Sequence, residues 1–291
     1  MDEFAIDKRT MRRAFSRAAL GYDTSAVLQR EVCKRMLERL DFIRLKPDRL
    51  LDAGSGTGWG GRQLSERYPD AEVISLDIAI GMLQAARKSA GWWQKLFGGR
   101  RQMAVCADVE ALPLMPNSVE MVWSNLALQW CNDLPSTFVE LHRVLKAEGM
   151  VMFSTFGPDT LKELRQAFRG VDEHNHLNRF ADMHDIGDML VHAGFSEPVM
   201  DMEYITLTYD DVKSVLNDLK AIGAHNATKG RGKGLMGKTA FSRLIGNYEK
   251  FRRDGKLPAT YEIVYGHAWK PKPRVTRDGA AIVKTSFRMD K

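Results

Sequence analysis

The chain has 291 residues, enough for one large domain or a core with a smaller insertion. Its hydrophobic share of 44% and charged share of 27% are those of an ordinary soluble globular protein, and no apolar run approaches the roughly 18 residues that a membrane span needs. The net charge of +6 would suit a polyanionic partner, whether an acidic protein, RNA or a membrane surface.

The first residues and the cysteines indicate the compartment. The start, MDEFAIDKRTMRRAF, carries acidic residues and lacks the apolar stretch of a secretory signal. Cys33, Cys106 and Cys131 have neither paired nor C-x-x-C spacing, which argues against a disulfide framework or a zinc site. We therefore expect a cytoplasmic protein with no bound metal.

Residues 1–44 are predicted to be helical. TSAVLQREVCKRMLERLDFI (24–43) has helical periodicity, and we expect this segment to lie across the edge of the core and over a ligand site.

Residues 45–158 alternate short apolar runs with amphipathic stretches. Such alternation is typical of βαβ units, so the sequence predicts an α/β fold with a parallel, Rossmann-like sheet. The predicted strands are RLLDAG (49–54), AEVISLDI (71–78), RQMAVCAD (101–108), VEMVWSNL (119–126) and EGMVMFSTF (148–156).

The first predicted strand runs into the glycine-rich stretch LDAGSGTGWGG (51–61). Glycines at this point allow a tight turn and a close approach of the backbone to a ligand. A dinucleotide enzyme would show G-x-G-x-x-G with an acidic residue about 20 positions on, and Asp77 does end the second strand. The glycine spacing alone does not decide between a dinucleotide and another nucleotide cofactor.

Asp52 and Asp108 favour a different cofactor. Asp52 would repel a pyrophosphate at the end of the first strand, whereas it would attract the ammonium of a methionine moiety. Asp108, at the end of the third strand, can accept a hydrogen bond from a nucleobase edge. Together with Asp77, acidic residues at the ends of three predicted strands then favour the same cofactor.

These features resemble the class I S-adenosylmethionine-dependent methyltransferases. The resemblance implies S-adenosyl-L-methionine as cofactor, Asp77 at its ribose, and Asp108 with Val109 at its adenine. The remaining expected cofactor contacts are Tyr22, Gln29, Asp52, Gly54, Ser55, Gly56, Gly58, Ile78, Met82 and Asn125.

The fourth strand leads into WSNLALQWCND (123–133). Methyltransferases that act on nucleic-acid bases typically show N/D-P-P-Y/F here, and this chain lacks those prolines, so we expect no nucleic-acid substrate. We expect Trp123, Asn125 and Gln129 to lie close to the transferred methyl group.

Residues 159–258 are rich in helical patterns and are expected to form a cap over the carboxyl edge of the sheet. A strand near 198–209 and a last strand within 259–270 would complete a seven-stranded sheet, the last strand antiparallel. The basic stretch 271–291 is expected to be peripheral.

Residues 232–239, GKGLMGKT, match the phosphate-binding P-loop pattern. A P-loop needs a buried strand before it, and here a predicted helix end and a polar loop precede it. We interpret the match as accidental.

Several further segments resemble the malonyl-acyl-carrier-protein O-methyltransferases of biotin synthesis. They are FSRAALGYDTSAVLQREV (15–32), WSNLALQWC (123–131), VDEHNHLNRF (171–180), LKAIGAHNATKGR (219–231) and PATYEIVYGHAW (258–269). The resemblance implies methylation of the free carboxylate of a malonyl thioester, carried by acyl carrier protein or coenzyme A.

GPDTLKELRQAF (157–168) also resembles a mitochondrial complex I assembly factor that hydroxylates a protein arginine, which leaves that activity as an alternative. A non-catalytic S-adenosylmethionine-binding assembly protein is a third hypothesis, and a nicotinamide oxidoreductase is a fourth.

A malonyl carboxylate is ionised at neutral pH, so its methylation needs no general base. It needs a clamp for the carboxylate, for which an arginine is suited, and Arg179 is the candidate. Acyl carrier proteins are acidic, and we expect a basic patch of the glycine-rich loop to attract them. Its residues are Lys229, Arg231, Lys233 and Lys238.

Overall fold

The computed structural model describes residues 5–89, 103–171, 177–222, 228, 230 and 236–273. Their centre is one seven-stranded sheet with the order β3-β2-β1-β4-β5-β7-β6. The strands are β1 (Arg49–Ala53), β2 (Glu72–Asp77), β3 (Met103–Cys106), β4 (Val119–Asn125), β5 (Leu145–Phe156), β6 (Ser196–Tyr209) and β7 (Leu257–Trp269).

The strand directions confirm the predicted Rossmann-like fold. β1 pairs in parallel with both β2 and β4, so that Leu51 lies between Ile74 and Val122. β7 runs antiparallel to β5 and to β6, as expected of the last strand. Because the parallel strands are covered on both faces, their apolar runs are almost continuous rather than alternating.

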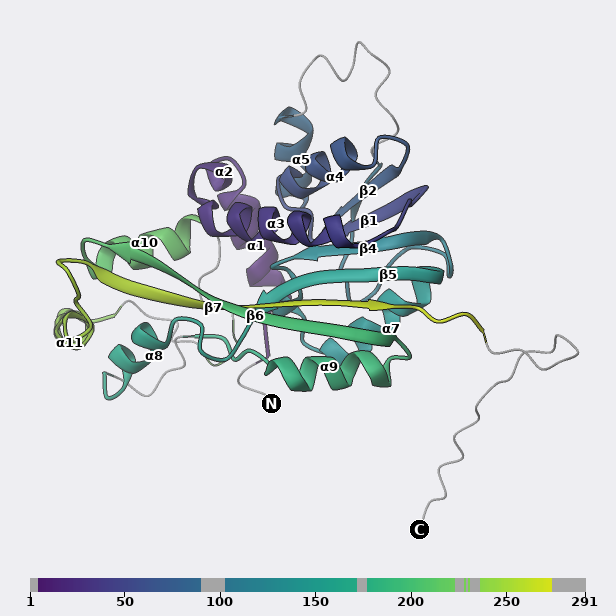
Figure 1. The fold of residues 1–291 in the computed structure, drawn as a ribbon. Coiled ribbons are helices and arrows are strands. Elements are labelled where there is room, and N and C mark those ends of the chain that lie inside the picture. The colour runs from purple at the N-terminus through teal and green to yellow at the C-terminus, as the bar shows by residue number, and fades with distance from the viewer. Residues whose placement is uncertain are drawn as a thin grey trace, which may run out of the picture.

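Helices cover both faces of the sheet (Figure 1). One face carries α3 (Val27–Arg39) and α4 (Trp59–Arg67), whose Val32, Met36 and Leu64 are in one core cluster. The opposite face carries α7 (Leu134–Val144) and α9 (Met183–His192), in a second cluster. α5 (Ile80–Ser89) packs against β2 and β3.

Three helices of the 159–258 region gather at one end of the sheet (Figure 1). They are α8 (Lys162–Phe168), α10 (Val212–Ala221) and α11 (Lys238–Glu249). Tyr248 of α11 is fully buried, and its hydroxyl donates to the Pro258 carbonyl at 3.0 Å, which joins this helix to the start of β7. The sequence pattern grouped α9 with these helices, but its buried Ile186 and Leu190 pack on the sheet face beside α7.

The amino-terminal segment forms α1 (Lys8–Ala18) and α2 (Tyr22–Ser25) before α3. α1 begins at the N-cap Asp7, whose side chain accepts from the Thr10 amide. α1 crosses α5 closely, because Gly81 has no side chain: a Cβ there would lie 2.8 Å from the backbone of Ser16. Among the described residues, every helix is too short or too polar to span a lipid bilayer.

Residues 232–235 of the P-loop match lie outside the described residues. The described element before the match is the helix α10, and the element after it is α11, with Gly237 as its N-cap. A strand would be needed in place of α10 to hold a phosphate in the P-loop manner.

Candidate active site

The glycine turn after β1 has a backbone that only glycine adopts easily. Gly54, Gly56 and Gly58 have φ values of 81°, 54° and 77°. The Gly54 and Ser55 amides both donate to the Leu76 carbonyl of β2, at 2.8 and 2.9 Å. A Cβ on Gly54 would lie 2.2 Å from that of Ala127, so the turn packs directly on the chain that follows β4.

Asp77 ends β2 and helps to hold the turn. Its two carboxylate oxygens accept from the amides of Gly56, at 2.9 Å, and Ala79, at 2.7 Å. Burial raises the pKa of Asp77 to about 6, although the two amide donors act in the opposite direction. The carboxylate lines a hollow together with Gly54 and Gly56.

Asp52 is almost fully buried at the end of β1, and its Oδ2 has no hydrogen-bond partner among the described residues. The same is true of Oε1 of Gln29 and Nε1 of Trp123. Burial, followed by repulsion from Asp77, raises the pKa of Asp52 to about 7. Unpaired buried polar atoms are rare in folded proteins, and a cluster of them is typical of a site for a polar ligand.

These atoms surround a small hollow of about 60 Å³ on one side of the glycine turn. Its lining includes the expected residues Tyr22, Gln29, Asp52, Gly54, Ser55, Gly56, Trp123 and Asn125. The structure thus brings together residues from α2, α3, the turn and β4, which are far apart in the sequence.

A second hollow, of about 80 Å³, lies on the other side of the turn. The expected residues in its lining are Tyr22, Gly54, Gly56, Asp77, Ile78, Asp108, Val109 and Asn125. Lys8 of α1 also lines it, with Nζ 3.1 Å from Asp108 and 2.5 Å from Glu110. Burial lowers the pKa of Lys8, but the hydrogen bond to Glu110 and the nearby negative groups outweigh it and raise the pKa overall.

Asn125 fixes the geometry where the two hollows meet. Its Nδ2 donates to the Gln29 carbonyl of α3 at 2.9 Å, and its Oδ1 accepts from Ser154 at 2.9 Å. The amino-terminal helix is therefore attached to the ends of both β4 and β5.

Three expected contacts, Gly58, Gln129 and Met82, are not part of the lining of either hollow. Gln129 donates to the Leu126 carbonyl at 2.7 Å. Met82 is 1% exposed and packs with Ala19 and Ala79 in a core cluster under α1. Gln129 and Met82 support the walls of the site in this structure.

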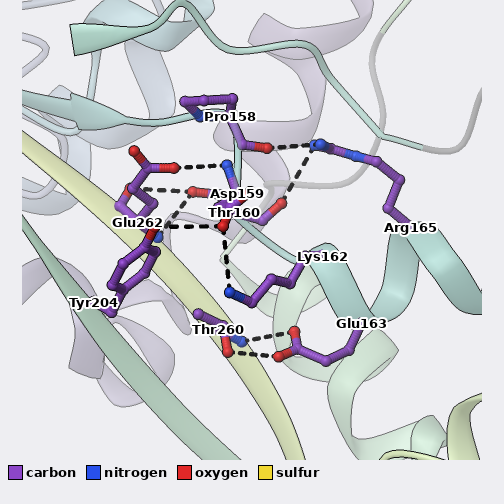
Figure 2. A network of polar contacts seen from close by, with 9 residues as sticks. All are labelled: Pro158, Asp159, Thr160, Lys162, Glu163, Arg165, Tyr204, Thr260 and Glu262. Atoms are coloured by element: carbon purple, nitrogen blue, oxygen red, sulfur yellow. Dashed lines mark hydrogen bonds and ion pairs between the residues drawn. The ribbon is translucent and has the colours of Figure 1, made fainter.

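The chain after β5 is held by a polar network (Figure 2). Glu262 of β7 accepts from the Asp159 amide at 2.7 Å, and Arg165 of α8 donates to the carbonyls of Pro158 and Thr160 at 2.6 and 3.3 Å. Beneath them, the buried Glu163 accepts from the Thr260 hydroxyl at 2.6 Å. The network fixes the start of the helical cap on the last strand.

Arg179 is exposed and lies close to this network. Its neighbour Phe180 packs edge-on against Phe156 of β5, with ring centroids 5.5 Å apart. Desolvation lowers the pKa of Arg165, the charge of Asp159 raises it, and the charges of Arg169 and Arg179 lower it again. Several guanidinium groups therefore share one region, which is favourable for an anion.

The expected carrier patch is only partly described. Lys229, Arg231 and Lys233 lie outside the described residues. Lys238 is the exposed first residue of α11. Within the described ranges, no group of three His, Cys, Asp or Glu side chains could hold a metal ion.

Sequence reasoning placed residues 1–44 over the ligand site but named no residue of α1 as a contact. Lys8, Met11 and Phe15 line the second hollow, and Phe15 packs against Trp130 with centroids 5.2 Å apart. The spacing of Met11 and Phe15, four residues apart, was the available signal for one buried helix face.

Comparison with solved structures agrees with this fold. The YcgJ protein from Bacillus subtilis is 16% identical and superposes with a TM-score of 0.59, over 84% of this chain and 99% of its own. A SAM-dependent methyltransferase from Thermotoga maritima is 18% identical, with a TM-score of 0.52 over 89% of this chain and 99% of its own. At these identities the likeness concerns the fold.

Comparison of sequences is more specific. A model described as "Methyltransferase domain" matches residues 51–153, from the end of β1 into β5. A protein of Gallionella capsiferriformans named malonyl-[acyl-carrier protein] O-methyltransferase is 78% identical, over 99% of this chain and all of its own length. A protein of the same name from Nitrosospira multiformis is 63% identical over 93% of this chain and 92% of its own. The chain therefore belongs to the malonyl-[acyl-carrier protein] O-methyltransferase family, and it is a methyltransferase that uses S-adenosyl-L-methionine.

Proposed function

We propose that this protein methylates the free carboxylate of a malonyl thioester attached to acyl carrier protein. The observation that carries the proposal is the 78% identity, over the full length, to a relative with this name. Bound S-adenosyl-L-methionine would supply an electrophilic methyl group on a sulfonium. A carboxylate oxygen would form the new C–O bond as the S–CH₃ bond breaks, and the product would be a methyl ester.

The two hollows around the glycine turn suit the two ends of the cofactor. Asp52 and Gln29 present unpaired oxygens to one hollow, where they could accept hydrogen bonds from a methionine ammonium. Asp77, already oriented by two amides, can accept from ribose hydroxyls. Ile78, Asp108 and Val109 line the other hollow and would surround the adenine.

Arg179 is the proposed clamp for the malonyl carboxylate. An ionised carboxylate is already a nucleophile, so the protein has to orient it and exclude water rather than remove a proton. The positive field of Arg165, Arg169 and Arg179 favours that charge. Arg165 donates to two backbone carbonyls, whereas Arg179 is exposed, and we take Arg179 as the candidate for direct contact because of its exposure and charge.

Family membership favours methyl transfer over the alternative activities. The two relatives described above carry O-methyltransferase names, and this weighs against arginine hydroxylation and against a purely structural role. Free acyl carrier protein and coenzyme A are cytoplasmic thiols, and three unpaired cysteines suit that reducing compartment.

Intact-mass spectrometry of malonyl-acyl carrier protein, after incubation with the protein and S-adenosyl-L-methionine, tests the proposal. We expect a gain of one CH₂ group, no gain with acetyl-acyl carrier protein, and some gain with malonyl-coenzyme A at higher concentration. Cofactor binding without any mass gain would contradict the proposal.

Kinetics of Arg179→Ala test the clamp. We expect kcat/KM for the malonyl substrate to fall about 100-fold, which corresponds to the 2–3 kcal/mol of a charge-assisted hydrogen bond. The neighbouring exposed Arg169→Ala is the control and should fall less than threefold. Equal losses in the two variants would mean that Arg179 acts only through the general positive field.

A further inference from the structure

The outer face of α1 is unusually basic. The helix reads KRTMRRAFSRA, with five basic side chains and no acidic one. Arg9, Arg12, Arg13 and Arg17 are exposed, and their spacing places them on adjoining positions of one helix side. Among the described residues, none of these four guanidinium groups has an ion-pair partner, so their charge is not neutralised locally.

The inner face of the same helix holds this charged face in place. Met11 is 3% exposed and packs with Ile6, Ile78 and Trp130. Before the helix, the Ile6 amide donates to Asn132 at 2.7 Å, and Ile6 pairs with Thr228 in an antiparallel bridge. α1 thus lies between the end of β4 and the helical region, with a fixed orientation.

The arginines border a hollow with an apolar floor. Arg12, Arg13 and Arg17 surround about 520 Å³ of space, with Ile78 and Ile80 beneath them. Ile80 is 51% exposed, and Leu20, just beyond the helix, is 85% exposed. Ile78 also lines the second hollow of the candidate active site, so this surface adjoins that site.

We propose that the arginine face of α1 is the docking surface for the acidic carrier protein that brings the malonyl thioester. This inference rests on the proposed function and adds a partner surface to it. A basic rim around exposed aliphatic side chains suits an acidic protein with apolar residues among its carboxylates. Single-stranded nucleic acid is typically bound by aromatic side chains that stack on the bases, and the lining of this hollow contains none.

Such a surface acts chiefly on association. Charged groups at the rim of an interface raise the association rate and lose this effect as salt screens them. Because the docked protein would be held away from the reacting carboxylate by its thioester arm, the arginines should affect KM for the carrier-bound substrate and leave kcat almost unchanged.

The test is the double charge reversal Arg12→Glu with Arg13→Glu, measured with two malonyl thioesters. For malonyl-acyl carrier protein we expect kcat/KM to fall about tenfold at low salt, with a smaller difference at high salt. For malonyl-N-acetylcysteamine, which has the same reacting group and no protein, we expect less than a twofold change.

The matched control is Arg44→Glu with Lys46→Glu. Both residues are exposed and precede β1, so they lie at the opposite edge of the sheet from the glycine turn, and the change in net charge is the same. This control should keep the wild-type kcat/KM for both thioesters.

Three outcomes would overturn the docking surface. They are an equal loss with both thioesters, an unchanged rate with malonyl-acyl carrier protein, and an equal loss with malonyl-coenzyme A, which would mean that phosphates are recognised instead of a protein. Failure of the wild-type protein to methylate any malonyl thioester would instead refute the proposed function, so the two failures can be told apart.

Discussion

We predict that Asp52 favours cofactor binding at the expense of stability. Its carboxylate is buried, lacks a partner on Oδ2, and has its pKa raised to about 7 by burial and by Asp77. An acid whose folded pKa lies above the unfolded value binds more protons when folded. The free energy of unfolding should therefore decrease as pH rises from about 4 through about 7.

Asp52→Asn removes this ionisation. We expect the cofactor-free variant to be more stable than the wild type at pH 8 by about 2 kcal/mol, an amount equivalent to one to two pKa units, with a smaller difference near pH 5. Affinity for S-adenosyl-L-methionine should fall at least tenfold, because the ammonium loses a carboxylate partner.

Urea unfolding at the two pH values and calorimetric titration would measure both effects. Asp48→Asn, exposed just before the same strand, is the control and should change neither. A variant that binds the cofactor as tightly as the wild type would remove Asp52 from the proposed site.

In the glycine turn, the cost of a positive φ can be separated from the cost of a steric clash. Gly54→Ala combines a positive φ with a Cβ only 2.2 Å from Ala127, so we expect a loss of about 3 kcal/mol in stability and very weak cofactor binding. Gly56→Ala has a positive φ but no atom within 4 Å of the added Cβ, so it should lose about 1 kcal/mol. Denaturant titration of both variants checks this, and equal losses would contradict the packing argument.

At the scale of elements, the position of α1 depends on its crossing with α5. A Cβ at Gly81 would meet the Ser16 backbone at 2.8 Å, so Gly81→Ala should push α1 away from the second hollow, which α1 helps to line. We expect the dissociation constant of S-adenosyl-L-methionine to rise about tenfold, with a loss of 1–3 kcal/mol in stability.

Gly246→Ala in α11 is the control for this change, since nothing lies within 4 Å of its added Cβ. The Gly246→Ala variant should bind S-adenosyl-L-methionine as tightly as the wild type in the same titration. An undiminished affinity in Gly81→Ala would show that α1 does not contribute to the cofactor site.

The junction of α8 with β7 depends on a buried carboxylate. Thr260→Val removes the hydroxyl that donates to Glu163 at 2.6 Å and leaves that oxygen without this partner (Figure 2). We expect a loss of about 2 kcal/mol in urea unfolding. Thr206→Val, on the exposed side of β6, should be neutral, and a neutral Thr260→Val would contradict the importance of the junction.

The sequence predicted most elements, because their patterns depend on local burial. All seven strands and the antiparallel last strand were expected from apolar runs bounded by turns. The start of β5 was predicted at 148, whereas the strand begins at Leu145, because the bend at Glu148, with φ 64°, resembles a turn in sequence. The location of α9 depended on contacts between distant helices, which periodicity does not contain.

In the whole molecule, the candidate site is formed by segments that are far apart in the sequence. Asn125 of β4 contacts α3, Lys8 of α1 contacts Asp108 after β3, and Asp23 accepts from Thr57 of the glycine turn. Strand-end residues could be predicted because the ends of parallel strands meet at one edge. The individual contacts of α1 could not be predicted, because helical periodicity identifies a buried face without showing which residues that face meets.

The most direct test of the account is to locate the transferred methyl group. S-adenosyl-L-methionine carrying a ¹³C-methyl group would be incubated with the protein and malonyl-acyl carrier protein, and the product would be studied by carbon-detected NMR. We predict a methyl-ester signal that disappears on mild base treatment. A labelled methyl on a side chain of the carrier protein, or no labelled product while the cofactor still binds, would contradict it.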